Sequence, residues 1–191
     1  MQYNVAGLLK APTGEMREVE LDEALVLDEP DIRLVAPITG RLRLIRDHAG
    51  VLVEGRLETR AALECARCLA PVAVDVAFEL SEAFRPTVVL PGGPTPPPPE
   101  DLDPATQIDA LHVLDLTEVV RQAVLLALPV HPLCRQACAG LCPRCGSDLN
   151  ERPCDCPAET DARWAALRAM LETDGEEHGA EDSAPEMGPS T

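Results

Sequence analysis

Residues 51–65 read VLVEGRLETRAALEC, and small or apolar residues alternate with polar ones along the stretch. The odd-numbered positions from Val51 to Cys65 are small or apolar, whereas charged residues such as Glu54, Arg56 and Glu58 lie between them. Because successive side chains of a strand point to opposite faces of a sheet, this pattern predicts a long strand with one buried face and one solvated face.

Two further strands are predicted beside it. The sequence Asp-His-Ala-Gly at 47–50 is typical of a turn, and it follows a stretch in which Leu42 and Leu44 are the apolar positions. After residues 65–71, CARCLAP, the alternation resumes from Val72 to Leu80. Three strands joined by short turns predict an antiparallel meander.

Helices are predicted after the sheet. Asp115-Leu116-Thr117-Glu118 has the form of a capping box, and apolar residues then recur with helical spacing until Pro129 ends the helix near Leu128. A final helix is expected to start at Thr160 or Asp161. Its apolar stripe, Trp164, Leu167 and Leu171, has the spacing of a core-facing stripe.

Composition and charge exclude several classes of protein. The 191 residues are 46% hydrophobic but only 2% aromatic, so aliphatic residues must fill the core. No apolar run approaches the ~18 residues of a membrane span, and the N-terminus lacks the basic and apolar regions of a signal peptide. We therefore expect a cytoplasmic protein, in which eight cysteines are not expected to form disulfides.

The formal net charge of −17 is unevenly distributed. Residues 15–31, 79–118 and 171–191 are acidic, whereas 41–70 contains six arginines and four acids. A solvated acidic surface that aids solubility is the simpler interpretation. Contact with RNA through the arginine-bearing region is the alternative, opposed at long range by the net charge.

Six cysteines crowd into one segment and predict a metal site. Cys142-x2-Cys145 followed by Gly146 has the form of a knuckle that directs two sulfurs at one ion, and a second pair would complete a tetrahedral site. The candidate ligands are Cys134, Cys138, Cys142, Cys145, Cys154 and Cys156. Structural zinc is the expected occupant; an iron–sulfur cluster, free thiols, or His131 as a substitute ligand are the alternatives.

Cys65-Ala66-Arg67-Cys68 lies at a corner between two predicted strands. A redox motif of the thioredoxin type would instead begin a helix, which lowers the pKa of its first thiol. We interpret Cys65, Arg67 and Cys68 as candidates for contact with a partner. A tight corner of small residues, participation in a metal site, and thiol redox activity remain alternatives.

Several of these motifs, in this order, resemble the YceD family of large ribosomal RNA subunit accumulation proteins. They are Cys65-x2-Cys68-Leu69 with Pro71-Val72, Leu126-Ala127-Leu128-Pro129, Gly140-Leu141-Cys142-Pro143-x-Cys145-Gly146, and Leu149-Asn150 before Cys154-x-Cys156. The resemblance covers roughly residues 5–171. It implies a non-enzymatic role in 23S rRNA accumulation, and hence in ribosome biogenesis.

The partner expected from the resemblance is an assembly intermediate of the large ribosomal subunit. Direct contact with a basic ribosomal protein or with 23S rRNA is left open, and neither a membrane nor a small-molecule substrate is expected. Acidic segments suit a basic partner through charge complementarity.

The expected fold class is α+β, with an antiparallel meander or partial barrel, two helices and a small cysteine-rich zinc segment. We expect an antiparallel β region over 1–85 and a Pro-rich loop over 86–106. Residues 107–171 are expected to hold both helices and the zinc segment, packed on the same domain. Residues 172–191 are expected to form a disordered acidic tail.

Overall fold

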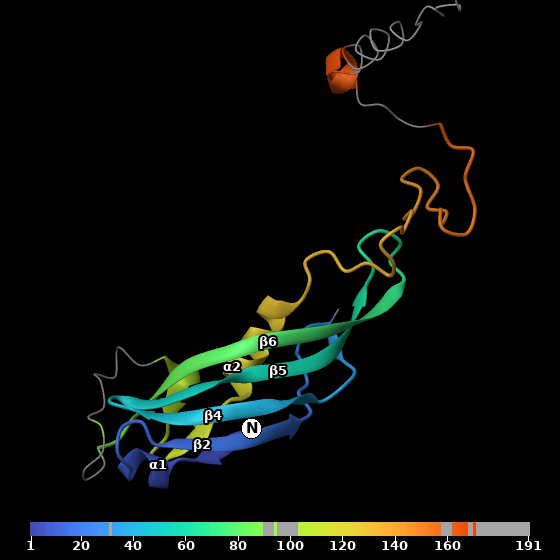
Figure 1. Ribbon diagram of the computed structural model, residues 1–191. Helices are drawn as coiled ribbons and strands as arrows, with labels where there is room; N and C mark the ends of the chain where they lie inside the picture. The colour runs from blue at the N-terminus through green and yellow to red at the C-terminus, as the bar shows by residue number, and fades with distance from the viewer. Residues whose placement is uncertain (31, 90–93, 95–102, 158–161, 168–169, 171–191) are drawn as a thin grey trace, which may run out of the picture.

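The computed structural model describes the chain except for residues 31, 90–93, 95–102, 158–161, 168–169 and 171–191. Its main feature is a curled, half-barrel sheet with helix α2 (Thr117–Ala127) against it (Figure 1). The α+β fold class expected from the sequence is confirmed. Within the described residues, no helix combines the length and the hydrophobicity needed to span a bilayer.

The strands pair in the order β1-β8-β7-β6-β5-β4-β2, and β3 pairs with β5 outside this path. Their bounds are β1 Gln2–Asn4, β2 Met16–Glu23, β3 Arg33–Leu34, β4 Ile38–Asp47, β5 Gly50–Glu64, β6 Pro71–Pro86, β7 Gln107–Ile108 and β8 Val113–Asp115. The β4-β5-β6 meander is antiparallel as predicted, but β7 pairs parallel to β6. The sheet is therefore mixed, because the chain that leaves β6 returns alongside its last residues.

The long central strands follow the alternation in the sequence. Val51, Val53 and Leu57 of β5 are fully buried, and β6 adds Phe78 and Phe84 to the same core. The shorter helix α1 (Ala6–Lys10) contributes Leu8 and Leu9 to this cluster. Burying these aliphatic and aromatic side chains stabilises the body by roughly 1.5–3 kcal/mol for each fully buried residue.

Helix α2 begins and ends close to the predicted residues, but its N-terminus differs in detail. The Asp115 carboxylate accepts hydrogen bonds from the Thr117 N–H at 2.9 Å and the Thr117 hydroxyl at 2.6 Å. Glu118 does not complete the capping box, because its carboxylate binds the Arg121 guanidinium at 2.8 and 2.9 Å. The helix packs Val119, Val120 and Val124 onto the core next to β6.

Beyond the main sheet, β5 and β6 continue as a two-stranded arm. The β4–β5 ladder ends at Thr39 opposite Glu58, whereas β5 stays paired with β6 as far as Glu64 opposite Pro71. The two residues of β3 flank the arm opposite Ala61 and Ala62, and the Val35 N–H donates to the Arg60 carbonyl at 2.8 Å. Figure 1 shows the cysteine-rich segment near the tip of this arm, away from α2.

The chain beyond the cysteines does not pack as expected. Ala162–Trp164 form the 3-10 turn η3, and the side chains of Trp164 and Leu167 are 63% and 52% exposed. The expected core contact of this stripe is therefore absent from the described residues. Thr160, Asp161, Leu171, most of the Pro-rich loop and the acidic tail lie outside the described residues. The proposed domain boundaries remain a prediction.

Candidate metal centres

The structure divides the eight cysteines into two groups of four. The first cluster comprises Cys65, Cys68, Cys134 and Cys138, and the second comprises Cys142, Cys145, Cys154 and Cys156. Within each cluster all four sulfurs lie within 4.8 Å of one another. Each cluster could hold one metal ion.

The first cluster begins with a knuckle at the tip of the β5–β6 arm. The Cys65 N–H donates to the Ala70 carbonyl at 2.8 Å, and the Leu69 N–H donates to the Cys65 carbonyl at 2.9 Å. Leu69 has φ 60°, in the left-handed region that non-glycine residues rarely adopt. This tight turn brings the Cys65 and Cys68 sulfurs together.

A second knuckle has the same form. The Gly146 N–H donates to the Cys142 carbonyl at 2.9 Å, and Gly146 has φ 69°. A hydrogen bond from the Cys142 N–H to the Ser147 carbonyl, at 2.9 Å, joins the two ends of this knuckle. The two knuckles therefore share one backbone design, although one carries leucine where the other carries glycine.

Later parts of the chain supply the other two sulfurs of each cluster. In the first cluster, Cys65 Sγ lies 3.8 Å from Cys138 Sγ, and Cys68 Sγ lies 3.7 Å from Cys134 Sγ. Four sulfurs each about 2.3 Å from a central zinc would lie about 3.8 Å apart. The two separations match the edge of such a tetrahedron.

Hydrogen bonds and burial separate the pKa values of the thiols in the first cluster. The backbone N–H groups of Cys68, Cys134 and Arg67 lower the pKa of Cys65 to about 6. Loss of hydration, together with hydrogen bonding to Cys138, raises the pKa of Cys134 to about 12. One thiol is thus largely ionised at neutral pH while another stays protonated.

The second cluster repeats this division. The Ser147 hydroxyl and then its backbone N–H lower the pKa of Cys145 to about 6. Hydrogen bonding to Cys145, together with loss of hydration, raises the pKa of Cys156 to about 12. A divalent cation would favour the thiolate form of all four sulfurs, so its binding would displace protons from each cluster.

Comparison with known proteins agrees with the motifs. The family model of the large ribosomal RNA subunit accumulation protein YceD matches residues 53–171, a range that contains both clusters.

The chain belongs to the YceD family.

Relatives of this YceD-family chain occur in bacteria and in a plant. An uncharacterized protein of Mycobacterium tuberculosis is 38% identical over 130 residues, covering 68% of this chain and 60% of the relative. One of Mycobacterium leprae is 33% identical over 139 residues, covering 73% and 61%. The chloroplastic YCED homolog 1 of Arabidopsis thaliana, a large ribosomal RNA subunit accumulation protein, is 39% identical over 46 residues, covering 24% and 14%.

The chain thus spans about 60% of the length of the mycobacterial relatives that it matches. No solved structure matches it.

The clusters differ in their surroundings. Cys65, Cys68 and Cys138 are buried in a small apolar cluster with Ala70, Leu133 and Leu141 packed against it. In contrast, Cys142 is the only buried residue between 141 and 157. The first cluster of this YceD-family chain is therefore part of a small core, whereas the second lies in exposed chain.

The structure places the residues singled out in the sequence as follows. Cys65 and Cys68 join Cys134 and Cys138, so the six cysteines of 134–156 do not compete for one site. Arg67 turns back and donates from Nη1 to the Cys138 carbonyl at 2.7 Å. This bond joins the knuckle to the chain that follows α2, and contact of Arg67 with a partner stays a prediction.

The spacing of the first knuckle carried a signal for a metal site, which the sequence reasoning kept only as an alternative for Cys65 and Cys68. Cys65-x2-Cys68-Leu69 has the same spacing as Cys142-x2-Cys145-Gly146, but the leucine concealed the left-handed position. The geometry also disfavours a redox motif in this family member, because the knuckle joins two strands and Cys65 is 0% exposed.

The arginines of β4 and β5 are mostly engaged within the molecule. Arg41 pairs with Glu20 at 3.3 Å, and Arg43 pairs with Glu54 at 3.4 Å. Arg46 is buried and donates to the carbonyls of Leu9 and Gly50. The arginine-bearing region of this YceD-family chain is therefore a surface of mixed charge.

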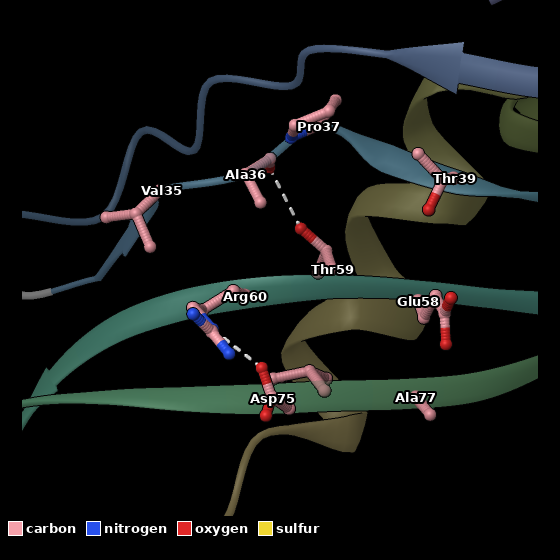
Figure 2. Close-up of a pocket in the computed structure, with 10 residues that line it drawn as sticks. Val35, Ala36, Pro37, Thr39, Glu58, Thr59, Arg60, Asp75 and Ala77 are labelled. Atoms are coloured by element: carbon pink, nitrogen blue, oxygen red, sulfur yellow. Dashed lines mark hydrogen bonds and ion pairs between the residues drawn. The ribbon is translucent and has the colours of Figure 1, made fainter.

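A shallow groove lies where the chain between β3 and β4 passes β5 (Figure 2). The Thr59 hydroxyl donates to the Ala36 carbonyl at 3.0 Å, and the Arg60 Nε lies 2.6 Å from an Asp75 oxygen. Two of the polar contacts in the groove are thus made within the molecule, between Thr59 and Ala36 and between Arg60 and Asp75.

Proposed function

We propose that this YceD-family chain is a non-catalytic factor that supports 23S rRNA accumulation and assembly of the large ribosomal subunit. The observation that carries the proposal is the family match over residues 53–171, which includes most of β5, all of β6 to β8, α2 and both clusters. The name of the Arabidopsis relative describes the same kind of role.

We further propose that each cluster holds a structural zinc ion. Zinc accepts four thiolates in a tetrahedral arrangement, and such a site has no open position for water or substrate. The metal would therefore hold the arm and the cysteine segment together and would take no part in bond making. An iron–sulfur cluster is the competing occupant, which metal analysis and visible absorption distinguish.

The surface charge supports a basic protein, or an rRNA–protein intermediate, as the partner. Glu18, Glu20 and Asp22 are exposed on β2, at the edge of a chain with net charge −17. Such a surface attracts basic partners and repels bare phosphate backbones. Because the nearby arginines are largely paired, isolated 23S fragments are expected to bind only weakly. We expect the protein to work in the cytoplasm, where ribosomes assemble.

The function is tested in a strain that lacks the gene for this chain. We expect the ratio of 23S to 16S rRNA to fall on deletion and to return with the wild-type gene. Complementation with Cys65→Ser or Cys142→Ser should fail, while the matched control Ala66→Ser, which adds a hydroxyl at an exposed position, should succeed. An unchanged rRNA ratio in the deletion strain contradicts the proposal.

The partner is tested by capture of the tagged holoprotein from cell extract at low and moderate salt. Recovery of large-subunit proteins or intermediates, lost progressively as salt rises, is expected for a contact dominated by charge. Recovery of no large-subunit component at either salt contradicts the proposed partner. Binding of isolated 23S fragments with a steep salt dependence would instead favour direct RNA recognition.

A further inference from the structure

The two clusters are joined by a very short piece of chain. Only residues 139–141 separate Cys138 of the first cluster from Cys142 of the second. Within this linker the Leu141 N–H donates to the Arg67 carbonyl at 3.0 Å, and the Gly140 carbonyl accepts from the Leu149 N–H at 2.9 Å. The linker is thus bonded on one side to the first knuckle and on the other to the turn that follows the second.

Asn150, in that turn, reaches the first cluster. Its Nδ2 lies 3.4 Å from Cys138 Sγ, with the amide as donor. Its Oδ1 accepts from the Ala139 N–H at 2.8 Å and from Arg135 Nη2 at 2.7 Å. A residue that stands between two ligands of the second cluster therefore supports the sulfur of a ligand of the first.

The carboxamide of Asn150 is fully used. Nδ2 also donates to Asp148 Oδ1 at 2.6 Å, and the backbone N–H of Asn150 donates to the same oxygen at 2.8 Å. Two donor hydrogens and two acceptor lone pairs each have a partner, which fixes the orientation of the amide. The contact with Cys138 is consequently a directed N–H···S hydrogen bond.

The position of Asn150 depends on the second cluster. The turn over 147–150 lies between Cys145 and Cys154, in a stretch where no residue after Cys142 is buried among those described up to 157. With so little apolar packing, the turn is held by the Leu141–Asp148 bridge and by the knuckle itself. An ion in the second cluster would supply the missing restraint.

We propose that Asn150 couples the two clusters: metal bound at the second cluster holds Asn150 in place, and Asn150 then strengthens metal binding at the first through Cys138. The inference rests on the metal occupancy proposed above. Groups that hydrogen-bond to metal ligands typically change metal affinity 10–100-fold. The coupling is reciprocal, since the same contacts connect both sites.

The test measures release of metal from the first cluster of the full-length zinc-loaded protein in excess chelator. Four proteins form a cycle: wild type, Asn150→Ala, Cys154→Ser with Cys156→Ser to empty the second cluster, and the combination. We expect the first two changes each to accelerate release from the first cluster about tenfold. The combination should be no faster than either, because both remove the same link.

Two further variants separate a specific hydrogen bond from general damage. Asn150→Ser keeps a side chain that favours turns but is one atom too short to reach Cys138, and it should behave like Asn150→Ala. Glu151→Ala removes an exposed side chain next to Asn150 and should leave release from the first cluster unchanged. With Co²⁺ as the probe, loss of the N–H···S bond should move the thiolate-to-cobalt band to longer wavelength in both Asn150→Ala and Asn150→Ser, but not in Glu151→Ala.

The outcomes distinguish the inference from the proposed function. A wild-type protein that holds no metal overturns the coupling and the proposed zinc sites, whereas the role in 23S rRNA accumulation is tested separately by the rRNA ratio in the deletion strain. A wild-type protein that holds two ions, with release and cobalt spectrum unaltered by Asn150→Ala and Asn150→Ser, overturns the coupling alone. Rate effects that multiply in the combined variant also overturn it, since they would come from independent causes.

Discussion

Leu69 and Gly146 occupy the same position in two knuckles, each with a left-handed backbone and each donating its N–H at 2.9 Å to the cysteine carbonyl four residues earlier. The left-handed conformation costs roughly 1–2 kcal/mol for an L-residue and almost nothing for glycine. The two knuckles thus differ in backbone strain although they share a hydrogen-bond pattern. The first cluster carries this strain at its exposed tip.

Leu69→Gly should therefore strengthen the first knuckle. Relief of strain is partly offset by the greater entropy of glycine in the unfolded chain, so the net gain is about 0.5 kcal/mol. Because Leu69 is 59% exposed, little packing is lost. We expect metal release from the first cluster to be about twofold slower. Faster release would contradict the claim that the backbone of Leu69 is strained.

Gly146→Ala should have the opposite effect on the second cluster. A Cβ at Gly146 meets no atom within 4 Å, so the cost is purely conformational, about 1 kcal/mol. Metal release from the second cluster should accelerate about fivefold, while thermal unfolding of the body stays unchanged. An unaltered release rate would show that the left-handed turn is not needed for that site.

Metal content gives the most direct check on the two groups of four. Elemental analysis of the purified protein should find two zinc ions per chain. Cys65→Ser and Cys154→Ser should each retain one ion, because each removes a ligand from a different cluster. If Cys65→Ser kept both ions, Cys65 would not be a ligand and the grouping would be wrong.

Metal affinity should fall as the pH falls. The pKa of Cys134 and that of Cys156 are raised to about 12, so binding at neutral pH must displace their protons. Below about pH 6, Cys65 and Cys145 also take up protons and the dependence becomes steeper. Competition titrations from pH 8 to 5 would measure the slope; a flat profile would exclude thiolate ligation.

Global stability should reside in the sheet and α2, not in the clusters. Phe84 is fully buried, and Phe84→Ala should lower the free energy of unfolding by about 3–5 kcal/mol. Leu126→Ala, at a side chain that is 87% exposed, is the matched control and should change it little.

Chelation should loosen the arm and the cysteine segment but not the body of the sheet. We expect increased hydrogen exchange over residues 59–65 and 71–76 without loss of the sheet signal in circular dichroism. Isolated two-stranded ribbons are marginally stable in water, which is why the arm responds and the body does not. Cooperative unfolding of the whole chain on chelation would contradict this separation.

The sequence predicted the parts of the fold that local periodicity determines. The alternation from Val51 to Cys65 became β5, and the helical spacing before Pro129 became α2. The parallel pairing of β7 with β6 could not be predicted from local periodicity. It depends on the path that the chain takes between the two strands. The capping box failed for a related reason: Arg121, one turn later, competes for the Glu118 carboxylate.

The sequence predicted that cysteines bind a metal, but it did not predict which cysteines share a cluster. A run of cysteines indicates metal binding, yet nothing local shows that Cys65 and Cys68 meet sulfurs more than sixty residues further along the chain. That meeting is produced by the length of the arm and by the path of the chain after α2, where the Ala66 N–H donates to the Pro132 carbonyl at 2.8 Å. Only tertiary structure contains this information.

The arm has a consequence for the living cell. If the clusters hold zinc as proposed, the protein in a zinc-starved cell would keep its folded sheet. The β5–β6 arm and the cysteine segment, however, would be less ordered. The amount of protein would then stay constant, while the fraction of it that is active would rise and fall with the supply of zinc. Under the proposed function, large-subunit assembly would then follow zinc availability without the synthesis or destruction of a single polypeptide.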